Sequence, residues 1–164
     1  MTEFFKYAGL ALIAVAAILT ARRYDAYTRR RLAVTESFLR LLRHVRGRIF
    51  TFLEPLPRAV RSFSDEMLES VGFLGAVREG ACLSDAFSAV AERCSLGAVA
   101  RELIGSTFAS LGRGTREETV AFTDSRISEL TELLEQEREE LARSVKLTRT
   151  LMYAAALGII ILFV

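Results

Sequence analysis

Hydrophobic and polar positions divide the chain of 164 residues into three parts. Residues 7–21 and 150–164 carry no charge, and a segment rich in arginine and glutamate separates them. Crossing the hydrocarbon core of a bilayer takes about 20 helical residues. Both runs approach that length when their apolar flanks are included and flanking basic side chains reach toward the headgroups. The pattern therefore predicts transmembrane helices over residues 4–21 and 147–164, with a polar domain over residues 22–149.

The first apolar run also has the length of a signal peptide, which would be cleaved after small residues. Its matching triplet, AVA at 14–16, lies inside the run, and arginines follow where the cleavage site would be expected. We therefore expect an uncleaved anchor. Basic residues flank the two spans on the side of the middle segment, namely Arg22, Arg23, Arg29, Arg30, Arg31, Lys146 and Arg149. The positive-inside rule predicts from them that residues 22–149 face the cytoplasm.

The middle segment has the apolar periodicity of amphipathic helices. Phe38, Val45 and Phe52 repeat every seven residues, which predicts a long helix that ends before Pro55. The other members of its apolar face are Leu32, Leu39, Leu42 and Ile49. Shorter helices are predicted from Pro57, over 65–77, from a cap at Ser84 to about residue 94 after a stop at Gly80, and over 96–111.

The last helix is predicted to be the longest. Thr115 and Glu118 have the spacing of a capping box at its start, and neither glycine nor proline interrupts it before residue 157. A coiled-coil-like seam, which Glu137 weakens, comprises Val120, Ile127, Leu130, Leu134, Leu141 and Val145. The predicted fold class is all-α, a cytoplasmic bundle of about six helices between N- and C-terminal transmembrane helices.

The two long helices carry opposite charge. Residues 22–50 hold nine arginines and two acids, whereas residues 117–140 hold nine acids and two arginines. If both helices rise from one membrane, the residues at equal height are Arg31 with Glu140, Arg40 and Arg43 with Glu129 and Glu132, and Arg46 with Asp124. Because an exposed pair contributes only about 0–1 kcal/mol, such pairs would set register rather than stability. Two separately solvated charged faces are the alternative.

Patterns typical of catalysis or metal binding are missing from the sequence. There is one histidine, Cys82 and Cys94 form no CxxC pair, and there is no Walker loop, HExxH motif or nucleophile elbow. The GRG at 112–114 is typical of a helix terminator rather than a phosphate loop. We therefore expect no enzymatic activity, no cofactor, no metal and reduced thiols. Beside a membrane anchor, the arginines at 29–31 favour anionic lipid over nucleic acid as a partner.

The breaks between helices indicate where a protein partner would dock. A helix over residues 22–53 is about 45 Å long, so its far end and the break before residue 115 lie farthest from the lipid. A large peripheral partner would meet this tip first. The residues that we predict to bind it are Pro55, Pro57, Arg58, Arg113 and Arg116. Solvent-exposed turns without a partner are the alternative.

These elements, in this order, resemble the stage III sporulation protein AB family. The most specific segments are EPLPRAV at 54–60 and SLGRGTREETVAF at 110–122, and the shared layout covers essentially the whole chain. The family tends to have Asp and Gln where this chain has Thr115 and Thr119. Threonine at position 115 still suits a helix cap.

The resemblance implies a membrane subunit of the channel complex between mother cell and forespore, located in the outer forespore membrane with its soluble domain in the mother-cell cytoplasm. That domain would be similar to F-type platform proteins of type II secretion and type IV pilus systems. The implied partners are a companion sporulation ATPase of the secretion type, other membrane subunits of the channel complex, the lipid bilayer and further copies of the chain. We therefore predict a non-enzymatic platform that couples the ATPase to the transmembrane assembly. A membrane-anchored coiled-coil protein that transmits signals or acts as a scaffold is the alternative.

Overall fold

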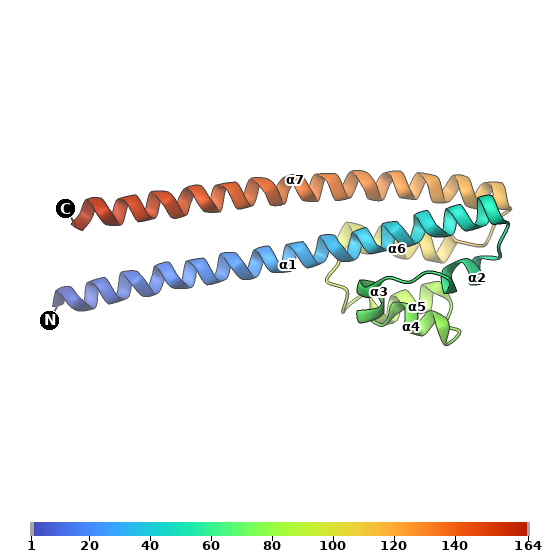
Figure 1. Ribbon diagram of the computed structural model, residues 1–164, viewed down its shortest axis with the longest axis horizontal. Coiled ribbons are helices and arrows are strands. Elements are labelled where there is room, and N and C mark those ends of the chain that lie inside the picture. The colour runs from blue at the N-terminus through green and yellow to red at the C-terminus, as the bar shows by residue number, and fades with distance from the viewer. Residues whose placement is uncertain (1, 164) are drawn as a thin grey trace. The chain divides into compact units, whose positions relative to one another are not determined.

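The protein is all-helical in the part that the structure describes. A computed structural model describes the backbone of residues 2–163 and the side chains of residues 15, 18–20, 22–23, 26–115, 117–148 and 150–151. The helices are α1 (Thr2–Phe52), α2 (Leu56–Arg61), α3 (Glu66–Ser70), α4 (Phe73–Arg78), α5 (Leu83–Val90), α6 (Ala98–Ser110) and α7 (Arg116–Phe163), as labelled in Figure 1. The predicted all-α class is confirmed. The chain forms two compact units, Met1–Arg29 with Arg138–Val164, and Arg30–Glu137.

The predicted membrane spans belong to the first of these units. Both stretches are helical as far as their backbone is described, but most of their side chains lie outside the described residues. Among the described residues, none of the helices combines the length and the apolar character that a membrane crossing requires. The spans at 4–21 and 147–164 therefore stay predictions.

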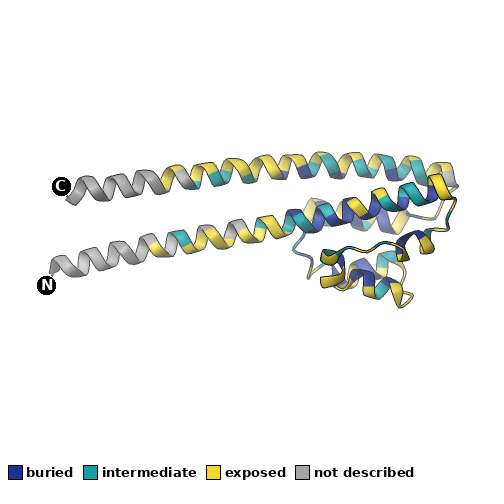
Figure 2. Cartoon of the chain, in the orientation of Figure 1, coloured by how far each residue is buried: buried dark blue, intermediate teal, exposed yellow. Residues whose placement is uncertain are grey.

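In the unit Arg30–Glu137, α1 is the central helix. Figure 1 shows α7 along one side of it and α2 to α5 on the other. The side chains of Val34, Phe38, Leu41 and Val45 are at most 2% exposed, and Figure 2 shows this stretch as mainly buried. The helix is buried around most of its circumference because it has neighbours on both sides.

Most of the predicted apolar face of α1 is confirmed. Leu32, Leu39, Leu42 and Ile49 are all buried, as are Phe38 and Val45. The prediction is wrong for Phe52, which is 64% exposed. It is the last residue of α1, and the next residue, Leu53, has a left-handed backbone (φ 58°) that turns the chain away.

Four phenylalanines from four helices form the centre of the core. Phe38 of α1 contacts Phe73 of α4, Phe87 of α5 and Phe108 of α6 edge-on, with ring centroids 5.3, 5.5 and 6.0 Å apart respectively. Phe73 and Phe108 stack at 5.5 Å. These are the preferred geometries of aromatic pairs, and each contributes about 0.5–1.5 kcal/mol beyond the area that it buries. The cluster fixes the short helices onto α1.

The short helices differ from the predicted ones in number and start. The helix predicted over 65–77 is two helices, α3 and α4, because Gly72 between them has a left-handed φ of +87° that no helix continues through. The bundle thus has one helix more than expected. The predicted cap at Ser84 is also wrong, since Cys82 is the N-cap of α5 and makes no side-chain cap hydrogen bond. The stop at Gly80, with φ +106°, is confirmed.

The capping box at the start of α7 is confirmed. The Thr115 backbone N–H donates to Glu118 Oε2 at 2.8 Å, and the Glu118 N–H donates to Thr115 Oγ1 at 3.3 Å. The first of these bonds is the main reason that the pKa of Glu118 lies below its ordinary value. Farther along the predicted seam, Leu130 and Leu134 are buried. The start of α7 is therefore defined by its own residues and its middle by packing.

Candidate partner-binding surface

Three of the predicted tip residues, Pro55, Pro57 and Arg58, lie at the start of α2. Pro55 is the N-cap of α2 and Pro57 lies in its first turn, where a missing backbone N–H removes no helical hydrogen bond. Pro55, Pro57 and Arg58 are exposed, and so is Arg113 in the loop between α6 and α7. The side chain of Arg116 lies outside the described residues.

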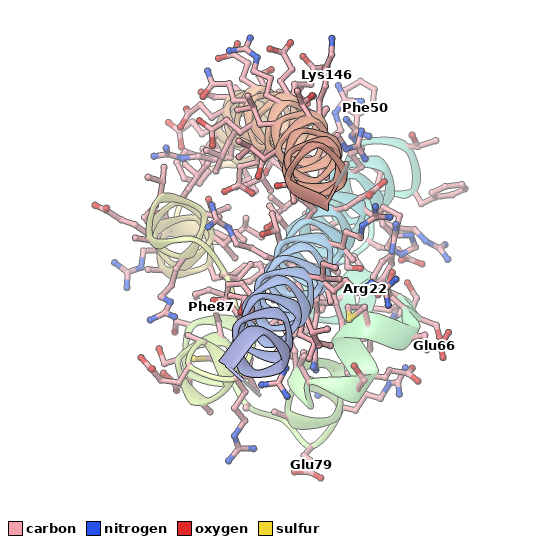
Figure 3. The ribbon with its side chains drawn as sticks, turned by 90° about the vertical axis from the view of Figure 1, so that its left-hand side faces the viewer. Arg22, Phe50, Glu66, Glu79, Phe87 and Lys146 are labelled. Carbon is pink, nitrogen blue, oxygen red and sulfur yellow. The ribbon has the colours of Figure 1, made fainter. Side chains whose placement is uncertain are left out.

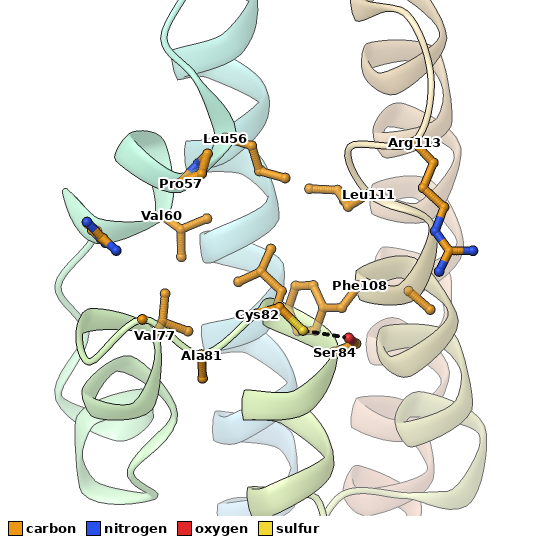
Figure 4. Close-up of a pocket in the computed structure, with 14 residues that line it drawn as sticks. Leu56, Pro57, Val60, Val77, Ala81, Cys82, Ser84, Phe108, Leu111 and Arg113 are labelled. Atoms are coloured by element: carbon orange, nitrogen blue, oxygen red, sulfur yellow. Dashed lines mark hydrogen bonds between the residues drawn. The ribbon is translucent and has the colours of Figure 1, made fainter.

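A groove joins two of these predicted residues. It has a volume of about 460 Å³ and is bordered by α2, by the turn between α4 and α5, and by the end of α6. Figure 4 shows the side chains of Leu56 of α2 and Leu111 pointing toward one another across the groove. Pro57 and Arg113 line the groove, whereas Pro55 and Arg58 do not.

The floor of the groove is apolar. Val60, Val77, Phe108 and Leu111 line it and are between 1% and 9% exposed, so they belong to the core and to the groove at once. Along the turn that starts α5 the groove is lined by Gly80, Ala81, Cys82, Leu83 and Ser84, which are small side chains apart from Leu83. A mainly apolar groove with a few polar groups is the usual construction of a binding site.

The charged side chains that line the groove are both positive. Arg61 and Arg113 line it, and no aspartate or glutamate does. Neither arginine, nor the adjacent Arg58, takes part in an ion pair among the described residues. Arginines elsewhere that do have a carboxylate within ion-pair distance are Arg31, Arg40, Arg46, Arg48, Arg78, Arg101, Arg126 and Arg143.

Three large apolar side chains at the end of α1 and in the turn after it are exposed, although the sequence placed Phe52 on the buried face and did not single out Phe50 and Leu53. Phe50, Phe52 and Leu53 are 59%, 64% and 60% exposed, and Figure 3 labels Phe50. The guanidinium carbons of Arg46 and Arg48 lie 5.2 and 5.4 Å from the ring centroids of Phe50 and Phe52, within the range of a cation–π contact. The available signal was position, because Phe50 and Leu53 fall outside the repeat that marks the buried face.

The predicted charge pairing of α1 with α7 is confirmed in one place. Arg46 donates two hydrogen bonds to Asp124, at 2.9 and 3.0 Å. Hydrogen bonding to Asp124, together with the negative charge of its carboxylate, raises the pKa of Arg46. Arg43 instead contacts the Thr131 hydroxyl at 3.2 Å. Arg40 binds Asp65 of the turn before α3 at 2.6 Å, so its predicted pairing with the acids of α7 is wrong.

The predicted pairing of Arg31 is the second correction. Its guanidinium pairs with Glu137 of α7 rather than with Glu140, and the side chains are 34% and 10% exposed. It also packs against Gly97, where an added Cβ would lie 2.8 Å from its Nη2 atom. Arg31 is therefore held by contacts within the bundle, and its position beside the membrane stays a prediction. Glu137, expected to weaken the seam, has a partner there.

The remaining membrane-flanking bases are on the surface of their helices. Those that the structure describes as exposed are Arg22, Arg23, Arg29, Arg30 and Lys146. The side chain of Arg149 lies outside the described residues. Their contact with lipid stays a prediction.

The described side chains offer little to catalysis or metal chemistry. No group of three or more metal-ligating side chains gathers among them. Both cysteines are free thiols, with Cys82 exposed on the rim of the groove and Cys94 buried. Burial raises the pKa of the Cys94 thiol to about 11, so it is protonated and unreactive at neutral pH.

Comparison with known proteins gives one finding. The family model for stage III sporulation protein AB matches residues 6–164, which include both units of the structure and the groove. No curated protein and no solved structure matches the chain.

Proposed function

The chain belongs to the stage III sporulation protein AB family, and from this membership we propose that it is a platform subunit of the channel complex between mother cell and forespore. It would couple a cytoplasmic ATPase of the secretion type to the transmembrane assembly. A role in sporulation follows from the family itself, which is not a known family of enzymes.

The docking role rests on two observations near the end of α1, arginines without an ion pair and large exposed apolar side chains. Arg58 and Arg113 have no ion pair among the described residues, and Phe50 and Phe52 expose more than half of their surface. Contact with a partner would remove this apolar surface from water, which is favourable. Unpaired arginines add selectivity for an acidic partner, because they steer association and penalise basic surfaces.

Membrane attachment is the second part of the proposal. The uncharged runs at 7–21 and 150–164 would cross the outer forespore membrane, and the basic residues beside them would hold the unit Arg30–Glu137 in the mother-cell cytoplasm. Three variants test this orientation. Each has a single cysteine, at position 3, 82 or 164, and Cys94 is replaced in all of them. A membrane-impermeant maleimide that reaches only the face opposite the mother-cell cytoplasm should label positions 3 and 164 and should spare Cys82, which is exposed on the bundle. Labelling of Cys82 from that face would reject the orientation.

The docking role is tested by co-purification of the companion ATPase with the full-length protein from detergent-solubilised membranes. Replacing Arg58 and Arg113 by glutamate should abolish co-purification. Arg93→Glu is the matched control, because Arg93 is also exposed and has no ion pair among the described residues, but it lies after α5 and outside the groove. Undiminished co-purification of the Arg58→Glu/Arg113→Glu variant rejects this surface.

A further inference from the structure

We infer that the groove between α2 and the end of α6 binds a short acidic segment of a partner protein, which inserts one apolar side chain between Leu56 and Leu111 and places carboxylates on Arg61 and Arg113. This inference rests on the proposed docking role and specifies the chemistry of the segment that docks.

The shape of the groove selects a side chain rather than a flat surface. Its volume of about 460 Å³ exceeds that of one large apolar side chain, and its floor consists of core residues such as Val60 and Phe108 that are already packed from below. Because these floor residues are already ordered by the core, binding on them should cost this chain little conformational entropy. Burial of a leucine or phenylalanine side chain on this floor would stabilise the complex, because it removes apolar surface from water.

The charge of the groove selects an acidic segment. Two guanidinium groups line it without a carboxylate from this chain, and Arg58 is exposed on the same helix as Arg61. Guanidinium binds carboxylate through paired hydrogen bonds, which are stronger than bonds between neutral groups. A lysine-rich or arginine-rich segment would meet the same charges and be repelled.

Another copy of this chain is a poorer occupant than a different protein. The acidic stretch of α7 offers carboxylates, but none of the exposed large apolar side chains lies between residues 117 and 140. Phe50 and Phe52, which are apolar and exposed, lie beneath the guanidinium groups of Arg46 and Arg48 and would bring further positive charge. Neither surface combines the apolar side chain and the carboxylates that the groove would take.

The test measures binding of short fluorescent peptides to the full-length protein in detergent by fluorescence anisotropy. The first peptide alternates leucine with aspartate, and the two reference peptides replace either the leucines by serine or the aspartates by lysine. We expect the leucine–aspartate peptide to bind at least about tenfold more tightly than either reference, and more weakly as salt is added, because exposed charges are screened.

Three variants separate the contributions that charge and the space in the groove make to peptide binding. Arg61→Glu combined with Arg113→Glu should weaken binding of the leucine–aspartate peptide at least about tenfold. Ala81→Trp, which fills the groove from its exposed rim, should weaken it without changing the charge. Arg93→Glu should leave it unchanged within twofold. Unaltered far-UV circular dichroism and continued protection of the buried Cys94 thiol show that each variant is folded.

The inference is overturned if the leucine–aspartate peptide does not bind the wild type, or binds no better than the leucine-free peptide. It is also overturned if all variants bind the peptide alike. A third result would be oligomers of the wild type that Arg61→Glu/Arg113→Glu dissociates, with no peptide binding. In that case a second copy of the chain covers the groove, and the inference is wrong.

Co-purification of the ATPase separates the two proposals. An ATPase that stays with the Arg61→Glu/Arg113→Glu variant leaves the platform role in place and rejects the groove as its site. Selective peptide binding without ATPase co-purification rejects the platform role and supports the groove.

Discussion

In the ion pair of Arg31 with Glu137, we expect the loss of one residue to destabilise the fold more than the loss of the other. The two side chains are unequally buried, with the carboxylate side chain 10% exposed and the arginine side chain 34% exposed. Removing one partner of a fully buried pair costs about 3–5 kcal/mol, whereas a fully exposed pair is worth about 0–1 kcal/mol. The loss should therefore depend on which of the two groups is left without a partner.

Methionine is the replacement for both residues, because it keeps an unbranched apolar stem. Arg31→Met leaves the buried carboxylate of Glu137 unpaired and should lower the free energy of unfolding by about 3 kcal/mol. Glu137→Met leaves a guanidinium that water already reaches and should cost about 1 kcal/mol. The double variant leaves no charge in the seam and should unfold within about 1 kcal/mol of the wild type, since apolar replacements of buried pairs are often neutral.

Labelling of Cys94 measures these differences. This thiol is buried in the unit Arg30–Glu137, so a maleimide reaches it only when the unit opens. Cys82 is exposed and is replaced by serine in every variant. When opening is fast compared with labelling, a loss of about 3 kcal/mol makes labelling roughly a hundredfold faster. Equal labelling rates for Arg31→Met and Glu137→Met would refute the reasoning from unequal burial. So would a double variant whose loss of stability equals the sum of the two single losses.

Two further predictions concern single residues of the bundle. Gly97→Ala places a Cβ 2.8 Å from the Arg31 guanidinium and should displace it from Glu137, so the substitution should lower the melting temperature of the wild type but not that of Arg31→Met. Burial raises the pKa of Asp65, but hydrogen bonds from Arg40 and from the backbone of α3 outweigh it and leave this pKa below its ordinary value. Asp65→Ala, which also removes the cap of α3, should cost about 1–2 kcal/mol at pH 7. A lowered pKa stabilises the fold above the pKa of the unfolded chain, so the difference in melting temperature should shrink below about pH 4; a constant difference would contradict the assignment.

Local signals in the sequence were sufficient for much of the fold. The buried face of α1 at Leu32, Leu39 and Leu42 follows from helical periodicity, and the start of α7 follows from the capping box of Thr115 with Glu118. Both signals act over about one to three helical turns, and tertiary contacts do not alter them. The split at Gly72 was missed because a glycine inside an apolar run is compatible with a continuous helix as well as with a break.

The partners of charged residues were the least predictable feature. Arg40 binds Asp65, whose position depends on how α3 packs, and not the acids of α7 that a simple register predicts. Arg46 with Asp124 was predictable because the two residues lie at equal height on the antiparallel helices α1 and α7. Glu137 was interpreted as a weakness of the seam, since its relation to Arg31 and Gly97 requires the placement of three segments.

Part of the candidate site could be identified from the sequence, and part of it depends on packing. Proline and arginine at the α1–α2 turn, and Arg113 before α7, were identified in the sequence as exposed breaks between helices, since proline and glycine end helices by their own backbone chemistry. The sequence alone thus determined most of the helices, most of their ends and the family of the chain. The groove and its unpaired charge were decided by tertiary structure, because its walls come from α2, the turn before α5 and the end of α6. Periodicity and capping depend on neighbours along the chain, whereas a cavity and an ion pair depend on distances that only packing sets.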